Sequence, residues 1–358
     1  MLQDAIGPLS DVHKRFIVVL EVAGIEAFIR MFCGLPGRPQ ADRHALARAF
    51  AAKAVVGLPQ TNMLIERLEV DKTLRRLCGW ERAGQVPSEA TFSRAFAEFA
   101  ESGLPARVHE ALIKKTLGSH LVGHISRDAT AIEAREKPAK AEKPEIAVPP
   151  KRKRGRPKKG EMVAKKAPRR LECQASQSLA QMLADLPTAC NIGTKRNAKG
   201  HTSSWIGYKL HIDTADGDIP VSCLLTSASL HDSQVAIPLA MITAQRVTNL
   251  YDLMDSAYDA PEIHAKARAL GHVPIIDENP RRNQANHELE ARAKRCAGYK
   301  TAEAIRYNER SGAERVNGAV KDSFGGRNVR VRGPAKVFCH LMFGILALTV
   351  ERLMQLLT

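Results

Sequence analysis

The sequence lacks the patterns that mark a disulfide-stabilised, zinc-binding or membrane-spanning protein. Its seven cysteines are odd in number and scattered, and none forms a Cys-x-x-Cys pair. The longest apolar run, Val337 to Val350, has about fourteen residues and contains His340, so it is too short to span a bilayer. The first residues lack the basic start and apolar stretch of a signal peptide. We therefore expect a cytoplasmic protein with no membrane partner and a buried helix near the end of the chain.

Acidic residues are scarce relative to basic ones. The chain has 38 Asp and Glu against 54 Lys and Arg, which gives a formal net charge of +16. Such an excess favours a polyanionic partner, and nucleic acid is a stronger candidate than an anionic membrane surface. With 358 residues and 44% hydrophobic content, the chain is long enough for two domains with their own cores. A wholly disordered protein is excluded.

The positive charge is concentrated in residues 137–170. This segment holds fourteen Lys or Arg, three Glu and six Pro, and it has no aromatic residue. It cannot bury a core, so we predict an extended or disordered linker. Its centre resembles an AT-hook, in which two arginines enter the minor groove of A/T-rich DNA. The alternative is a linker that binds phosphates without reading sequence. The residues of this motif are Arg154, Gly155, Arg156 and Pro157.

Before the linker, the sequence predicts helices. Apolar residues recur at three- and four-residue spacing between Gly and Pro breaks, with Ser88 as an expected N-cap and Gly103 as a stop. This pattern predicts an α-helical N-terminal DNA-binding domain over residues 1–120. Its short helices form either a helix-turn-helix-like reader of DNA or a plain scaffold.

On both sides of the linker, the pattern is that of an α/β fold. Residues 121–136 predict a short strand that ends at Asp128. After the linker, β-formers flank the stretch "ADGD", which predicts a hairpin, and helices then alternate with strands. The two segments 121–136 and 171–358 should therefore form one α/β domain, interrupted by the linker.

Three carboxylates are candidates for a shared metal site. Asp128 ends one predicted strand, Asp255 ends a later one, and Glu314 lies on a helix beyond. Strand ends meet at one edge of an α/β sheet, and a helix packed there can bring a third carboxylate. Such a set suits two Mg²⁺ or Mn²⁺ ions, which can cleave a phosphodiester bond. Asp259 is the main alternative to Asp255.

Other polar residues near these positions have plainer interpretations. His231 and Asp232 could contact a metal or DNA, but we expect Asp232 to cap the following helix. Asp277 and Glu278 follow a predicted strand and are expected to lie in a polar turn.

Four polar residues share one face of a predicted helix. Tyr307, Arg310, Glu314 and Lys321 fall within roughly 60° of one another at 3.6 residues per turn. Taken alone, this face could be a solvent-exposed helix with an i, i+4 ion pair. Together with the two upstream aspartates, it favours a face that holds a DNA strand beside metal ions.

This spacing resembles the Tyr-Arg-Glu-Lys box of bacterial insertion-sequence transposases of the DDE class. The stretches "RDATAIEA" and "MDSAYDA" are similar to the blocks around the two aspartates of that family. Similar stretches occur over most of the chain, including "PSEATFSRAFAEF" and "LTSASLHDSQVAIPLA".

The resemblance implies an α/β RNase H-like catalytic core, a mixed sheet flanked by helices. It implies cleavage of insertion-sequence ends with two divalent ions, Mg²⁺ or Mn²⁺, and joining of the 3′ hydroxyl to target DNA. Asp128, Asp255 and Glu314 would be catalytic metal ligands, while Tyr307, Arg310 and Lys321 would hold DNA. The implied partners are double-stranded DNA (transposon inverted repeats and target) and further copies of the chain in a homodimer or larger complex. The implied location is the bacterial nucleoid.

Two alternatives come from other functional classes. One is a domesticated transposase that binds DNA without chemistry, although the complete set of carboxylates argues against it. The other is an RNase H-like nuclease that cuts without strand transfer. The N-terminal helices and the Tyr-Arg-Lys face favour the transposase over the nuclease.

Overall fold

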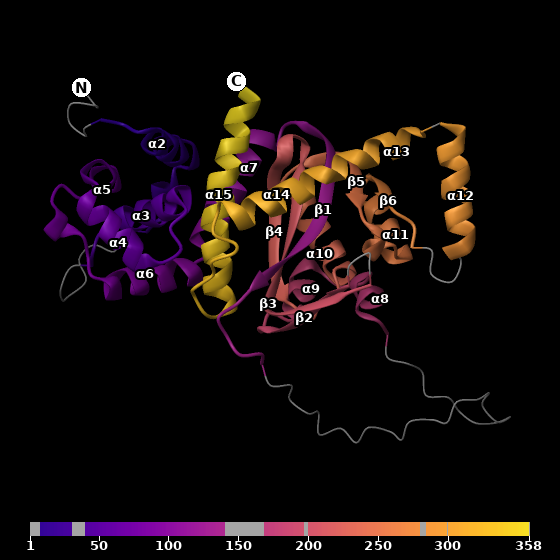
Figure 1. Ribbon diagram of the computed structural model, residues 1–358, viewed down its shortest axis with the longest axis horizontal. Helices are drawn as coiled ribbons and strands as arrows, with labels where there is room; N and C mark the ends of the chain where they lie inside the picture. Colours follow the sequence, from indigo (N-terminus) through magenta and orange to yellow (C-terminus); the bar gives the residue numbers. More distant parts are fainter. Residues whose placement is uncertain are drawn as a thin grey trace, which may run out of the picture.

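The computed structural model describes residues 8–30, 40–139, 168–196, 200–279, 284–298 and 300–357. A lobe of N-terminal helices lies beside a mixed sheet that is flanked by further helices (Figure 1). The AT-hook-like motif lies outside the described residues, so its predicted conformation stays a prediction.

The N-terminal lobe is helical, as the periodicity predicts. Several of its helices end where a glycine takes a left-handed conformation, with φ of 54° at Gly24, 73° at Gly57 and 111° at Gly79. Ser88 does precede a helix, but its hydroxyl makes no capping bond to the backbone and lies 3.3 Å from the Thr91 hydroxyl. The helices are α2 (Asp11–Ala23), η1 (Ile25–Phe28), α3 (Arg43–Val56), α4 (Thr61–Val70), α5 (Lys72–Cys78), η2 (Ala83–Gln85), α6 (Glu89–Glu101) and α7 (Leu104–Leu117).

The sheet has the topology of an RNase H-like core, which confirms the predicted fold class. Strand β3 is antiparallel to β1 on one side and to β4 on the other, while β5 and β6 continue from β1 in parallel. The hairpin at "ADGD" joins β3 to β4 through a short turn, η3 (Asp216–Asp218). The strands are β1 (Leu121–Glu133), β2 (Asn191–Arg196), β3 (Thr202–Ala215), β4 (Ile219–Ser227), β5 (Thr248–Met254) and β6 (Val273–Ile276).

Helices cover both faces of the sheet. Helix α10 (Ser233–Ala244) packs on β3 and β4 together with α8 (Arg170–Gln174) and α9 (Leu179–Asp185). Helix α14 (Ser311–Asp322) packs on β1 and β3 and continues the line of α13 (Ala302–Tyr307) and η5 (Asn308–Arg310) across the sheet (Figure 1). The remaining elements are η4 (Ser256–Tyr258), α11 (Pro261–Ala269), α12 (Gln284–Ala297) and α15 (Pro334–Leu357).

Helix α15 joins the N-terminal lobe to the sheet. It contacts α2, α3, α6 and α7 on one side and β4 on the other. One continuous cluster of buried apolar residues runs through both regions, with the phenyl rings of Phe50 and Phe343 5.9 Å apart. The segment Pro334–Leu356 is long and apolar enough to cross a membrane, but 72% of its apolar window is buried in the protein. This helix is a core element, in agreement with the prediction of a buried helix near the end of the chain.

Candidate active site

Asp128 on β1 and Asp255, the first residue after the parallel strand β5, lie at the same height in the sheet. The pairing of β1 with β5 puts Ser126 opposite Leu253, and two more residues along each chain bring Asp128 opposite Asp255. Adjacent strands are about 4.8 Å apart, so the two carboxylates are neighbours. Asp128 lies within β1 rather than at its end, contrary to our expectation. Strand β1 continues to Glu133 because it still pairs with β3 after β5 has ended.

Both carboxyls are half-buried and cost free energy to ionise. Burial raises the pKa of Asp128, and the nearby charge of Asp255 raises it further, against a hydrogen bond from the Ala129 backbone. Burial also raises the pKa of Asp255, although its carboxylate accepts a hydrogen bond from the Ala257 amide at 2.9 Å. Two carboxyls whose ionised forms are penalised in this way would gain from a nearby cation.

The predicted helix face spans three short elements rather than one helix. Tyr307 ends α13, Arg310 ends the 3₁₀ turn η5, and Glu314 and Lys321 belong to α14. The backbone stays close to helical through this junction, which keeps Tyr307, Arg310 and Glu314 near one another. The Arg310 guanidinium lies 5.8 Å from the centre of the Tyr307 ring and donates a hydrogen bond of 2.7 Å to the Glu314 carboxylate.

Arg310 is the cation that connects this face with the two aspartates. Its side chain is only 19% exposed, whereas that of Glu314 is 61% exposed, so the pair is not a simple solvent-exposed one. Burial disfavours its charge, yet the pKa of Arg310 is raised because Tyr307, Asp128, Glu314 and Asp255 favour the charged form. A guanidinium surrounded by three carboxylates offers a fork for a phosphate group.

Oxygen ligands suited to a hard divalent ion are present, but they do not converge fully. Among the residues that the structure describes, no three His, Cys, Asp or Glu side chains are grouped closely enough to hold a metal ion. The Glu314 carboxylate is turned toward Arg310. Asn317 donates a hydrogen bond of 2.9 Å to Asp128, and its buried Oδ1 atom has no hydrogen-bond partner. An unpaired buried oxygen beside two carboxylates fits the oxygen ligands that Mg²⁺ and Mn²⁺ prefer.

Two residues near the site were missed by sequence reasoning. Asn317 lies three residues after Glu314 on the same helical face, and this spacing was a signal that could have identified it. Lys195 lies on β2, a strand that the sequence did not predict, and its charge favours ionisation of both Asp128 and Asp255. Nothing in the sequence around Lys195 places it near the site.

The other carboxylates considered as metal ligands, Asp259 and Asp232, have partners of their own in the structure. Asp259 lies 3.3 Å from the His264 ring and accepts a hydrogen bond from the Asn279 amide, so its oxygens are used within the loop. Asp232 does not cap α10, contrary to our expectation, because its backbone is already helical. It accepts a hydrogen bond of 2.9 Å from Lys209 instead.

His231 and the two acids after β6 have local surroundings. The Nδ1 atom of His231 lies 2.8 Å from the Ser233 hydroxyl at the start of α10. Asp277 and Glu278 are exposed in the loop after β6, in agreement with the expected polar turn.

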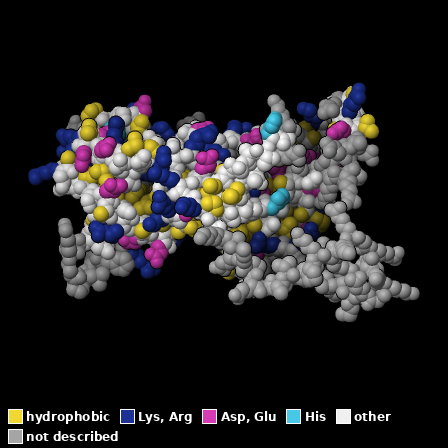
Figure 2. Space-filling model, turned by 60° about the horizontal axis from the view of Figure 1, so that its bottom comes forward, with side chains coloured by type: hydrophobic (Ala, Val, Ile, Leu, Met, Phe, Trp, Pro, Cys, Tyr) yellow, Lys and Arg dark blue, Asp and Glu magenta, His cyan; other side chains and the backbone are white. Residues whose placement is uncertain are grey.

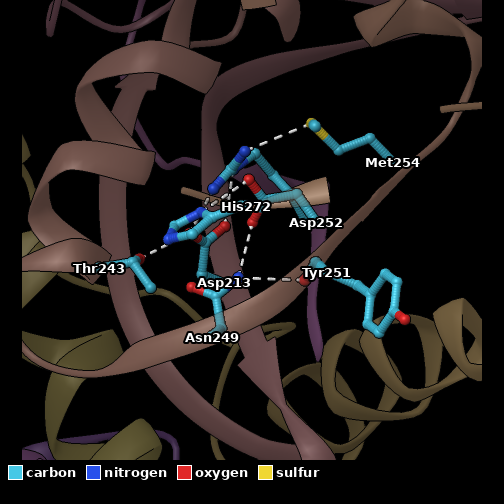
Figure 3. Close-up of polar contacts among 8 residues, drawn as sticks. Asp213, Thr243, Asn249, Tyr251, Asp252, Met254 and His272 are labelled. Carbon is cyan, nitrogen blue, oxygen red and sulfur yellow. Dashed lines mark hydrogen bonds and ion pairs between the residues drawn. The ribbon is translucent and has the colours of Figure 1, made fainter. Parts of the chain in front are cut away.

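A buried network of charges supports the strands that carry the aspartates (Figure 3). Arg127, 2% exposed, donates two hydrogen bonds of 2.8 and 2.7 Å to Asp213 on β3. Asp213 also accepts a hydrogen bond of 2.6 Å from Thr243 on α10. Close by on β5, Asp252 lies 3.1 Å from His272. Since neighbouring strand residues point to opposite faces, Arg127 faces α10 while Asp128 faces α14.

The chain matches two family models. One, described as a transposase DDE domain, covers residues 125–350, which is more than half of the chain. The chain belongs to the DDE transposase family. A second model, described as a transposase domain, covers residues 8–98 and thus most of the helical lobe of this transposase. No curated protein and no solved structure matches the chain.

The family membership confirms the resemblance seen in the sequence at the level of the family. The protein is a DNA transposase with an RNase H-like core, and DNA is its partner. Divalent metals are the cofactors generally used in this family.

Proposed function

We propose that this transposase cleaves the DNA at the ends of its insertion sequence with two divalent ions and joins the freed 3′ hydroxyl to target DNA. The observation that carries the proposal is the arrangement around Arg310. One cation with a low exposed fraction faces Asp128, Asp255 and Glu314, which come from three separate segments of the chain. A purely structural ion pair needs only one carboxylate for one cation, so three carboxylates around Arg310 favour a site that binds further cations.

Asp128 and Asp255 would hold the metal ions directly. Glu314 would join them by exchanging Arg310 for a metal ion, which leaves the guanidinium free for a DNA phosphate. When bound, two such ions activate the attacking oxygen and stabilise the leaving one. Mg²⁺ and Mn²⁺ suit this set of oxygen ligands equally by chemistry.

The reaction is tested with the full chain, Mg²⁺, linear DNA carrying the element's inverted repeats, and a circular target. Joined product would support the proposal. Cleavage without joining would favour a nuclease, and a gel shift without cleavage would favour a domesticated DNA-binding protein. A homodimer or larger complex should form on paired ends, and this is measured by the mass of the assembled complex.

Arg310→Ala and Lys321→Ala should each slow cleavage, because both side chains would position the phosphate beside the metals. A misplacement of about 1 Å can cost roughly 100-fold in rate, and we expect a loss of this order in single-turnover cleavage. Arg310→Ala should lower the melting temperature more than Lys321→Ala does, because three carboxylates favour the half-buried charge of Arg310, whereas burial and two neighbouring cations disfavour that of Lys321. Arg268→Ala, on the exposed surface of α11, is the matched control. Normal cleavage in both variants would show that this face does not hold DNA.

Deletion of residues 151–159 should weaken DNA binding and make its salt dependence shallower. The deletion removes seven of the fourteen basic residues in the 137–170 segment. Each lost phosphate contact reduces the slope of log K against log salt by about 0.9. Affinity is measured on A/T-rich and G/C-rich duplexes at several salt concentrations. Equal losses on both duplexes would indicate phosphate binding, and a larger loss on A/T-rich DNA would indicate minor-groove reading by Arg154 and Arg156.

A further inference from the structure

A second cationic site lies where the helical lobe meets the turn that precedes α15. An open cleft of about 400 Å³ is lined by residues of α3, α4, α6 and the start of α15, by Arg135 just after β1 and by residues 330–332. In Figure 2, Lys and Arg side chains gather on the face between the helical lobe and the sheet region. Five cations and one carboxylate, Glu89, line this basic cleft. The cations are Lys53, Arg135, Arg330, Arg332 and Lys336.

The local sequence explains why the rim of the basic cleft is positive. In the stretch "NVRVRG", Val329 is buried and Val331 is half-buried, while Arg330 and Arg332 between and after them are exposed. This alternation is that of an extended chain with one face on the core. The Gly333 amide donates a hydrogen bond of 2.9 Å to the Glu136 carboxylate, which holds the segment before α15 close to the end of β1.

The rim cations are not neutralised within the described part of the chain. None of Arg135, Arg330, Arg332 and Lys336 forms an ion pair with a described carboxylate. Elsewhere on the surface, ion pairs are common: Arg315 binds Asp218 through two hydrogen bonds. Four neighbouring cations without partners repel one another, and this repulsion is relieved when a polyanion binds.

Lys53, on the last turn of α3, lies deeper in the basic cleft. It is only 7% exposed, and among the described residues its ammonium group has no hydrogen-bond partner. Burial lowers the pKa of Lys53 to about 8. Lysine is rarely buried without a partner, because the loss of hydration is not compensated. Phe50 and Phe96 line the cleft together with Lys53, whose long apolar stem allows its charged end to reach a ligand in the cleft.

We propose that the basic cleft binds the phosphate backbone of double-stranded DNA outside the catalytic face, with Lys53 at its floor and the four other cations on its rim. The inference rests on the proposed function only in taking DNA as the partner. The inferred contact with the DNA backbone lies at the junction of the helical lobe and the sheet. Neither the carboxylates nor the Tyr-Arg-Lys face provides it.

The length of β1 sets the distance between the basic cleft and the carboxylates. Arg135 lies seven residues beyond Asp128 and two residues past the end of β1, so the two residues are at most about 23 Å apart at 3.3 Å per residue. A duplex rises about 3.4 Å per base pair, so the contacted phosphates should lie within roughly seven base pairs of the bond that is cut. Lys321 lies near Glu133 at the end of β1 and near Arg327, since both of their charges act on its pKa.

The first test is the salt dependence of binding by the full chain to a fluorescent duplex of about three helical turns. The double variant Arg330→Ala and Arg332→Ala should reduce the slope of log K against log salt by about 1.8, because two phosphate contacts are lost. The matched control, Lys115→Ala and Arg268→Ala, removes two exposed cations from α7 and α11 and should leave the slope near that of the wild type. Equal slopes for the double variant and the wild type would overturn the proposal.

The second test separates a binding role of Lys53 from a structural one. Lys53→Met keeps the stem and removes the charge, so the melting temperature should rise or stay unchanged while DNA affinity falls several-fold. A lower melting temperature with unchanged affinity would mean that Lys53 serves the fold. Ethylation of phosphates within roughly seven base pairs of the cut should interfere with wild-type binding and not with that of the arginine double variant. If the wild-type chain binds DNA through the basic cleft but never cleaves it, the proposed reaction is wrong and the proposed role of the cleft still holds.

Discussion

Asp128→Asn and Asp255→Asn should each abolish strand cleavage while leaving the fold at least as stable as in the wild type. Burial raises the pKa of both carboxyls, so each binds its proton more tightly in the folded chain than in the unfolded one. At a pH above both pKa values, ionisation therefore favours unfolding, and a neutral amide of similar size removes that cost. Loss of a metal ligand removes the ions that cleavage needs. Cleavage and melting temperature are measured on the same preparations.

Two controls sharpen this test. Asp259→Asn should cleave normally, because the Asp259 carboxylate already bonds to His264 and to the Asn279 amide. Mg²⁺ should raise the melting temperature of the wild type and have a smaller effect on the Asp128 and Asp255 variants, since only the folded site binds it. Full cleavage by Asp255→Asn together with loss in Asp259→Asn would mean that the second ligand is Asp259.

Asp213→Ala should lower the free energy of unfolding by about 3 to 5 kcal/mol, because it leaves the guanidinium of Arg127 buried without its partner. Arg127 and Asp213 are 2% and 0% exposed, so water cannot replace the lost hydrogen bonds. The Asp252 carboxylate nearby would compensate only in part, since it already lies against His272 and Asn249. Denaturant unfolding followed by circular dichroism measures the loss.

A double variant shows whether this loss arises from the unpaired charge. Arg127→Met with Asp213→Leu replaces both ions by apolar groups, and the free energy of unfolding should recover most of the deficit. Cleavage by the double variant should stay below that of the wild type, because Arg127 precedes Asp128 and the pair fastens β1 to β3. A loss under about 1 kcal/mol for Asp213→Ala would show that the pair contributes little to the fold.

The regular parts of the fold were predictable because their patterns are local. Helical periodicity identified the N-terminal lobe, and the alternation of β-formers around "ADGD" identified the β3–β4 hairpin. The proximity of Asp128 and Asp255 followed from the rule that parallel strands share an edge. The prediction that the strand ends at Asp128 was wrong. A sequence does not reveal that β1 keeps β3 as a neighbour after β5 has ended.

Other contacts between distant segments were not predictable. Strand β2 is short and lies at the edge of the sheet, so it carries little periodicity, and Lys195 was missed with it. Arg127 and Asp213 are 86 residues apart, and a buried ion pair has no spacing rule that a single sequence can display. The basic cleft likewise combines α3, α6, the segment 330–332 and the start of α15, whose basic residues look like ordinary surface residues one by one.

The sharing of α15 between the helical lobe and the sheet bears on how the protein can move. Because α15 belongs to one core with α2, α3, α6 and α7 on one side and β4 on the other, neither region can swing away without exposing apolar surface. Arg15 on α2 is also bonded to Glu351 on α15. If the lobe binds DNA as proposed, the distance along the DNA between that contact and the cut is fixed by the folded chain. Rearrangements during transposition would then have to occur between subunits or in the DNA itself.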